Sequence, residues 1–150
     1  MKRILLSIIM TVLTITCFAQ EYNISGAGQG KDGNYRVKVK TIVSKTEMAE
    51  DAVKQCAVHG VIFRGFIDPS GAASQKALVS DPNVAETKKA WFEAFFSEGK
   101  YLQYVSVVEL SCTKLSRKKY EASAILLVDK ESLRHYLETE GIIQGFSNLW

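Results

Sequence analysis

Residues 35–43 alternate apolar and charged side chains, and this two-residue period constrains the fold more than any other feature of the chain. Successive side chains of a strand point to opposite faces, so a strand with one covered face needs such a pattern. One face holds Val37, Val39, Thr41 and Val43, and the other holds Arg36, Lys38 and Lys40. The pattern predicts a strand with one buried face and one face in solvent.

A helix is expected next, from Ser44 or Thr46 to about His59, because small and apolar residues recur there at helical spacing. These residues are Met48, Ala49, Ala52, Val53, Cys56 and Ala57. Gly60 is interpreted as the glycine that ends the helix, and residues 61–66 as a short second strand. A strand–helix–strand unit favours parallel pairing of its two strands.

The rest of the chain is expected to contain a long connection, two helices and a strand hairpin. In order, these are the connection 67–81, an aromatic-rich helix 82–98, strands 101–112 and 119–128, a helix 129–139 and an apolar tail 142–150. The order β-α-β-α-β-β-α predicts an α+β fold. We expect a two-layer sandwich, with helices mainly on one face of a mixed sheet of about four strands.

Residues 1–19 have the three-part form of a cleavable export signal. Lys2 and Arg3 precede an apolar run, and small residues stand before Gln20. The run is too short to span a bilayer well, so no transmembrane span is expected in the mature chain. A retained anchor and a lipoprotein acylated at Cys17 are the alternatives. Residues 20–34 are expected to form a flexible glycine-rich leader, and residues 35–150 a single α/β domain.

The net charge of +3 overstates the charge of the expected mature chain. Without Lys2 and Arg3, 17 basic residues face 16 acidic ones, which leaves a net charge of +1. Such a balance gives no overall field that would attract nucleic acid or an anionic membrane.

Three short motifs invite a chemical interpretation, but none has the context that the chemistry needs. The glycines of residues 26–30 precede a strand, whereas a dinucleotide-binding fingerprint follows one. Cys56 and His59 stand three residues apart, as a thiol and its base can, yet Cys56 belongs to the apolar stripe of the helix. The histidines and cysteines lack the paired spacing of a zinc site. We predict no catalytic residue, no metal site and no cofactor.

Two groups of charged residues are the candidate binding residues. Arg64 and Asp68 stand at the start of the long connection, and connections of this length often carry function. The basic strand face of Arg36, Lys38 and Lys40 can meet an acidic glycan, a lipid head group or a partner protein.

The basic face can be extended by cations between the last two strands, if the outer strands are neighbours. These cations are Lys114, Arg117, Lys118 and Lys119. A protective role is the alternative, because lysines at the edge of a sheet prevent other strands from adding to it.

The expected mature chain keeps two cysteines, Cys56 and Cys112. In an oxidising compartment the two can form a disulfide. The alternative is a pair of separate buried thiols that behave as small apolar side chains.

The stretch from Tyr35 to Gly65 resembles the opening unit of small exported bacterial domains. The resemblance rests on a strand, a helix with Ala49, Ala52 and Ala57, and the sequence Val61-Ile62-Phe63. The families concerned are the LPP20-like modules and the N-terminal modules of flagellar-assembly proteins. It covers about a fifth of the chain. It implies a non-catalytic envelope module and no site residues.

We therefore expect a binding or assembly module of the bacterial periplasm or cell envelope, without catalytic activity. Its partner is an envelope protein or a glycan, and not nucleic acid. A small envelope hydrolase is the alternative, with its site in the region 64–81 and with Asp68, Arg64 or His59 taking part.

If the export signal is used, the protein recovered from the producing cell lacks residues 1–19 and begins at Gln20. Intact mass spectrometry of the envelope fraction measures this directly. A soluble cytosolic species that still carries Met1 to Ala19 would contradict export.

Overall fold

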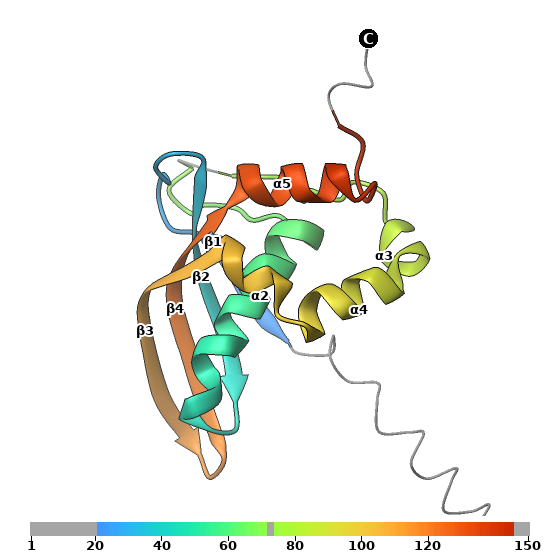
Figure 1. Cartoon of the computed structure of the whole chain (residues 1–150). Coiled ribbons are helices and arrows are strands. Elements are labelled where there is room, and N and C mark those ends of the chain that lie inside the picture. The colour runs from blue at the N-terminus through green and yellow to red at the C-terminus, as the bar shows by residue number, and fades with distance from the viewer. Residues whose placement is uncertain (1–20, 72–73, 146–150) are drawn as a thin grey trace, which may run out of the picture.

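The computed structural model describes residues 21–71 and 74–145, so the expected export signal and residues 146–150 lie outside the described chain (Figure 1). Helices and strands share one domain, as the predicted α+β class requires. They are β1 (Tyr22–Gly26), β2 (Asn34–Val43), the 3-10 helix η1 (Thr46–Met48), α2 (Ala49–Phe63), α3 (Val84–Thr87), α4 (Lys89–Ser97), the 3-10 helix η2 (Lys100–Tyr104), β3 (Val105–Ser116), β4 (Lys119–Asp129) and α5 (Lys130–Thr139).

The four strands form one sheet in the order β1-β2-β4-β3, and every neighbouring pair is antiparallel. The helices of the described chain lie on one side of this sheet (Figure 1). The α+β class, the two layers and the number of strands are confirmed. The mixed pairing is wrong: β2 and β3 run parallel across their helical connection, but β4 lies between them and pairs with both.

The alternation in residues 35–43 is confirmed, because the residues of the predicted covered face are buried under the helices. Alternate residues of the neighbouring strand β4 are buried on the same face. The two sets are Val37, Val39, Thr41 and Val43, and Ala122, Ala124, Leu126 and Val128. At roughly 25 cal/mol per Å² of apolar area removed from water, this face contributes much of the stabilising free energy.

Helix α2 does not end at Gly60, and the expected strand over residues 61–66 is wrong. The helix continues to Phe63, and Gly65 follows its last turn with a φ of 68° that favours glycine. Gly60 lies where β1 crosses the helix, and a Cβ atom there would come within 2.6 Å of Cδ1 of Ile24. The glycine therefore permits a close approach of helix and strand, and it does not stop the helix.

The expected flexible leader contains the edge strand β1. Tyr22 lies opposite Thr41 of β2, and Ile24 lies opposite Val39, so both side chains face α2. Only the residues between β1 and β2 form a turn. This strand adds a fourth member to the sheet, in place of the one that residues 61–66 were expected to supply.

The single helix expected over residues 82–98 is divided at Lys88, whose φ of −110° and ψ of 21° separate α3 from α4. The predicted aromatic stripe is nonetheless in the core. Its buried members are Phe92, Phe95 and Phe96. Phe95 also stacks on Tyr136, with ring centroids 6.1 Å apart, so the aromatic cluster joins α4 to α5.

The predicted hairpin and last helix are both present. The 3-10 helix η2 takes the first residues of the expected strand, so β3 begins at Val105 and extends to Ser116. Helix α5 begins as expected, because the side chain of Asp129 accepts a hydrogen bond from the backbone N–H of Ser132 at 3.1 Å. Ile142 is buried, so the beginning of the apolar tail docks on the domain.

Gly60→Val is expected to destabilise the protein, because the added methyl groups overlap with Ile24 of β1. Overpacking of this kind costs about 1–3 kcal/mol in the free energy of unfolding, which urea denaturation measures. Adding Ile24→Ala to this variant should recover part of the loss, since the smaller side chain makes room. A Gly60→Val protein as stable as the parent would contradict the close approach.

Candidate functional site

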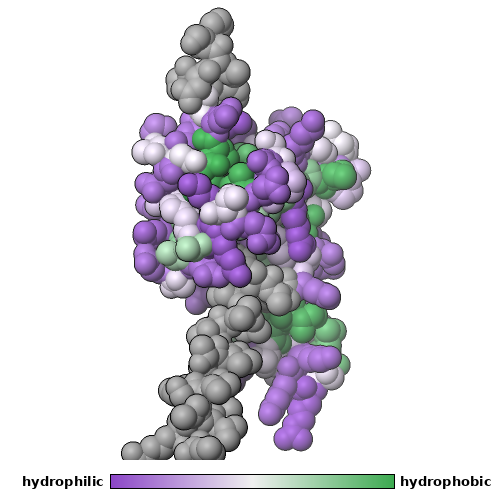
Figure 2. Space-filling view, turned by 90° about the vertical axis from the view of Figure 1, so that its right-hand side faces the viewer, coloured by the Kyte–Doolittle hydropathy of each residue, from purple (hydrophilic) through white to green (hydrophobic). Residues whose placement is uncertain are grey.

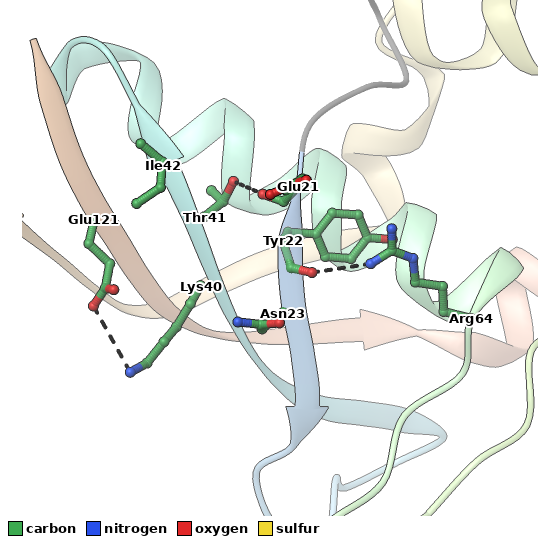
Figure 3. A pocket seen from close by; sticks show the side chains of 8 residues that line it. All are labelled: Glu21, Tyr22, Asn23, Lys40, Thr41, Ile42, Arg64 and Glu121. Atoms are coloured by element: carbon green, nitrogen blue, oxygen red, sulfur yellow. Dashed lines mark hydrogen bonds and ion pairs between the residues drawn. The ribbon is translucent and has the colours of Figure 1, made fainter.

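A hollow of about 360 Å³ opens at the start of β1 (Figure 3). β1 begins opposite Thr41, so the last two residues of β2 extend beyond it at this edge. The predicted site residues Arg64 and Lys40 both line it, from opposite sides of β1, although they are distant in sequence (Figure 3). The hollow is lined by Glu21, Tyr22, Asn23, Lys40, Thr41, Ile42, Arg64 and Glu121.

Arg64 is held in place at the rim of this hollow. It is the first residue after α2, and its guanidinium carbon lies 4.1 Å from the centroid of the Tyr22 ring. Its Nη1 donates a hydrogen bond to the backbone carbonyl of Tyr22 at 3.1 Å (Figure 3). A cation over an aromatic ring contributes about 0.5–2 kcal/mol. The other N–H groups of the planar guanidinium suit a carboxylate of a ligand.

Tyr22 and His59 form a part-buried polar pair next to Arg64. The Tyr22 hydroxyl lies 2.5 Å from Nδ1 of His59. Burial, together with the charge of Arg64, lowers the pKa of His59 to about 4, so the imidazole is neutral at neutral pH. Burial also raises the pKa of the Tyr22 hydroxyl well above its usual range. Both groups are thus neutral at neutral pH, and the hydrogen bond between them holds β1 against α2.

The opposite wall of the hollow carries a loosely held pair of charges. Nζ of Lys40 lies 4.0 Å from Oε1 of Glu121. Exposed ion pairs of this kind contribute about 0–1 kcal/mol, so Lys40 can turn to a ligand at little cost. The Thr41 hydroxyl donates to the backbone carbonyl of Glu21 at 3.0 Å, and this bond fixes the chain just before β1.

Lys40 also belongs to a row of cations on the face of the sheet that the helices leave open (Figure 1). We call Arg36, Lys38 and Lys40 the basic row; they occupy alternate positions of β2. On β4, Leu127 lies opposite Arg36 and Ile125 lies opposite Lys38. Lys38 and Ile125 also line a second hollow of about 480 Å³ that reaches β3. The basic row therefore leads from the hollow of Figure 3 across the open face.

The cations of the hairpin tip lie beyond the end of the basic row. Tyr120 of β4 pairs with Val43, the last residue of β2, so the tip extends past this strand. Glu121 then lies on β4 between the tip and Ser123, which is the partner of Lys40. The expected extension of the basic surface is thus interrupted by a carboxylate.

Asp68 lines neither hollow, and its carboxylate is engaged within the long connection. The residue is 5% exposed. One oxygen accepts hydrogen bonds from the Ser70 hydroxyl at 2.6 Å and the Ser70 N–H at 2.8 Å, and the other accepts from the Gly28 N–H at 3.0 Å. These bonds, those from Ser70 first, lower the pKa of the carboxyl group. Asp68 fastens the connection to the turn after β1.

The two cysteines are free thiols, so the structure does not contain the disulfide that the sequence allows. Cys56 is buried and hydrogen-bonded to Thr41, and burial raises the pKa of its thiol to about 11. Cys112 lies on β3, opposite Ala122, which in turn lies opposite Thr41. Cys112 is thus two strands away from Thr41, the residue to which Cys56 is hydrogen-bonded, and the two thiols are not joined.

The side chains of the hydrolase alternative do not meet around one hollow. Arg64 lines the hollow of Figure 3, His59 is bonded to Tyr22, and Asp68 is engaged in its loop. Within residues 21–71 and 74–145, no three His, Cys, Asp or Glu side chains gather into a metal site. In the same part of the chain, no helix has the length and apolarity needed to cross a bilayer.

Tyr22 is the main site residue that the sequence does not reveal. Residues 22–25 do alternate between apolar and polar side chains, as a strand would. The alternation is short and leads into the glycines of residues 26–30, so it could not be told from a leader. Glu121 likewise cannot be distinguished in the sequence from the other carboxylates, because its position near Lys40 depends on the pairing of β4 with β2.

Comparison of the chain with protein-family models, with curated proteins and with solved structures finds no match. The open face, the hollow of Figure 3 and the sequence are therefore the features that bear on function.

His59→Gln is expected to reduce the acid sensitivity of the fold. The pKa of His59 lies near 4 in the folded protein and near the ordinary 6.5 in the unfolded chain. The unfolded chain thus binds more protons in this window, and stability falls as the pH is lowered from about 6.5 to 4, by at most about 1.4 kcal/mol per pH unit.

Urea denaturation at several pH values measures this slope. Glutamine keeps an oxygen that can accept from the Tyr22 hydroxyl but does not titrate, so the slope should become shallower. His135→Gln is the matched control, because His135 is exposed. Equal slopes in the parent and the His59 variant would contradict the buried neutral imidazole.

Proposed function

We propose that this protein is an exported, non-catalytic binding module of the bacterial cell envelope. Its open sheet face binds an acidic segment of a partner protein. The observation that carries the proposal is the basic row, Arg36, Lys38 and Lys40, on a face that no helix of the described chain covers (Figure 1). The hollow of Figure 3 lies at the Lys40 end of this row, and Arg64 lines it from the other side of β1.

The charges of the basic row are largely uncompensated. Within residues 21–71 and 74–145, Arg36 and Lys38 make no ion pair, and Lys40 has only the pair with Glu121 at 4.0 Å. Alternate side chains of a strand stand about 6.6 Å apart. An extended acidic segment has the same spacing, so it can oppose the row residue by residue.

The apolar side chains beside the row favour a protein segment over a glycan. Ile125 and Leu127 are half-buried next to Lys38 and Arg36, and Ile42 is 45% exposed. Contact with such side chains adds affinity only where the partner has apolar groups of its own. A segment that alternates acidic and apolar residues fits this surface best.

The titratable groups support binding over catalysis. The Cys56 thiol has a raised pKa and is protonated at neutral pH, so it is a poor nucleophile. The neutral His59 is bonded to Tyr22, and the oxygens of Asp68 accept hydrogen bonds from its own loop. Arg64 and the basic row recognise charge, and they need no activated group to do so.

The location is supported by the sequence. The basic start and the apolar run of residues 1–19 are typical of export signals. The resemblance of residues 35–65 to exported bacterial modules points to the same compartment.

Photo-crosslinking in intact cells tests the proposal, with a photoreactive phenylalanine analogue in place of Ser123 on the open face. The row variant carries Arg36→Gln, Lys38→Gln and Lys40→Gln. The control carries Lys114→Gln, Arg117→Gln and Lys118→Gln, which remove the same charge from the hairpin tip. The row variant should give about tenfold less crosslinked partner, because opposed charges across an interface are lost, and the control should match the parent.

Two results would overturn the proposal. One is repeated recovery of the chain alone, and the other is a crosslinked partner whose yield does not respond to the row variant. An adduct whose added mass is carbohydrate would overturn the class of partner. Circular dichroism of the purified variants shows whether each of them is folded.

A further inference from the structure

β3 is an edge strand with one long free side. It pairs with β4, and no described strand pairs with its other side. All residues from 108 to 116 are exposed, including three large apolar ones. These are Val108, Leu110 and Leu115, at 45%, 39% and 55%. The free N–H and C=O groups of such an edge can bond a further strand.

The sequence of β3 does little to block pairing. Lysine or proline usually protects an exposed edge, yet residues 108–113 contain neither, and Glu109 is their one charge. Irregularities of the ladder with β4 occur at both ends, between Val107 and Glu109 and between Lys114 and Ser116. The regular stretch of residues 109–114 between them is left free, and Lys114 at its end is the one lysine within it.

We infer that this edge pairs in antiparallel fashion with β3 of a second copy of the chain, joining two four-stranded sheets into one. The distribution of charge selects this partner and direction. Glu109 stands near the start of β3, whereas the cations of the hairpin tip follow its end. Antiparallel pairing places the cationic end of each copy towards the Glu109 end of the other. Parallel pairing would bring two cationic tips together, which is repulsive.

Two-fold symmetry restricts the register. A two-fold axis perpendicular to the sheet places the covered faces of the two copies on the same side of the joined sheet. Even-numbered residues of the regular stretch therefore lie opposite even-numbered residues of the other copy. The regular stretches of the two copies overlap best when the two-fold axis passes beside Ser111 or beside Cys112. Cys112 then lies opposite Leu110 or opposite the Cys112 of the other copy. In both registers the two exposed thiols lie within about 8 Å, whereas Cys56 is buried.

Sedimentation velocity over a dilution series of the purified exported protein tests the inference. The edge variant combines Ser111→Lys with Cys112→Lys, which sets lysine against lysine in either register, at position 111 in one and at position 112 in the other. The control combines Ser97→Lys with Thr139→Lys, which add the same charge at exposed positions of α4 and α5. The parent and the control should form a dimer, and the edge variant should dimerise at least about tenfold more weakly.

A short bismaleimide crosslinker gives a second measurement at the same surface. It should link two copies of the parent protein, and Cys112→Ser should abolish the link. Equal melting temperatures of parent and edge variant show that the variant is folded. The basic row is unchanged in every variant, so the result does not depend on the proposed function.

Three outcomes would overturn the inference. A protein that is monomeric at its highest soluble concentration excludes the second copy. A dimer that the edge variant leaves intact places the interface elsewhere. Crosslinking of Cys112 in intact cells to a different protein, with no linked pair of copies, assigns the edge to a foreign strand.

Discussion

The close packing of α2 on the covered face of the sheet is the constraint on which the rest of the structure depends. Gly60 has no side chain, so Ile24 of β1 can lie directly against the helix. The same approach brings Tyr22 to His59 and sets Arg64 over the Tyr22 ring. One glycine thus determines both where the edge strand docks and how the basic rim of the hollow is held.

Figure 2 shows another side of the molecule, where hydrophobic groups interrupt a mostly hydrophilic surface.

The elements that the sequence predicts well are those whose signals are local. The alternation of residues 35–43, the hairpin and the capping Asp129 all depend on neighbours along the chain. Gly60 shows the limit of this reasoning, because a glycine that stops a helix and a glycine that admits another strand are identical in sequence. The sequence does not indicate the antiparallel sheet for a related reason: the insertion of β4 between β2 and β3 is a long-range arrangement without a local pattern.

The residues of the candidate site likewise fall into those that a local pattern predicts and those that depend on long-range packing. The basic row is predicted directly by the two-residue period of β2, because every second residue of such a strand faces away from the core. The position of Arg64 and Lys40 around one hollow does not follow from a local pattern, since it depends on β1 and on the length of α2. Asp68 is charged, as a binding residue often is, but its hydrogen-bond partners are those of a turn residue. Only the hydrogen bonds from Ser70 and Gly28 distinguish the two.

The bond from Thr41 to Glu21 ties the very beginning of the described chain to the hollow of Figure 3. Removal of residues 1–19 would create a new α-amino group on Gln20, one residue before Glu21. Such a group has a pKa of about 7.7–8.0, so it carries most of a positive charge at neutral pH. If the chain is cut there, a positive charge is therefore added one residue before Glu21, which lines the hollow.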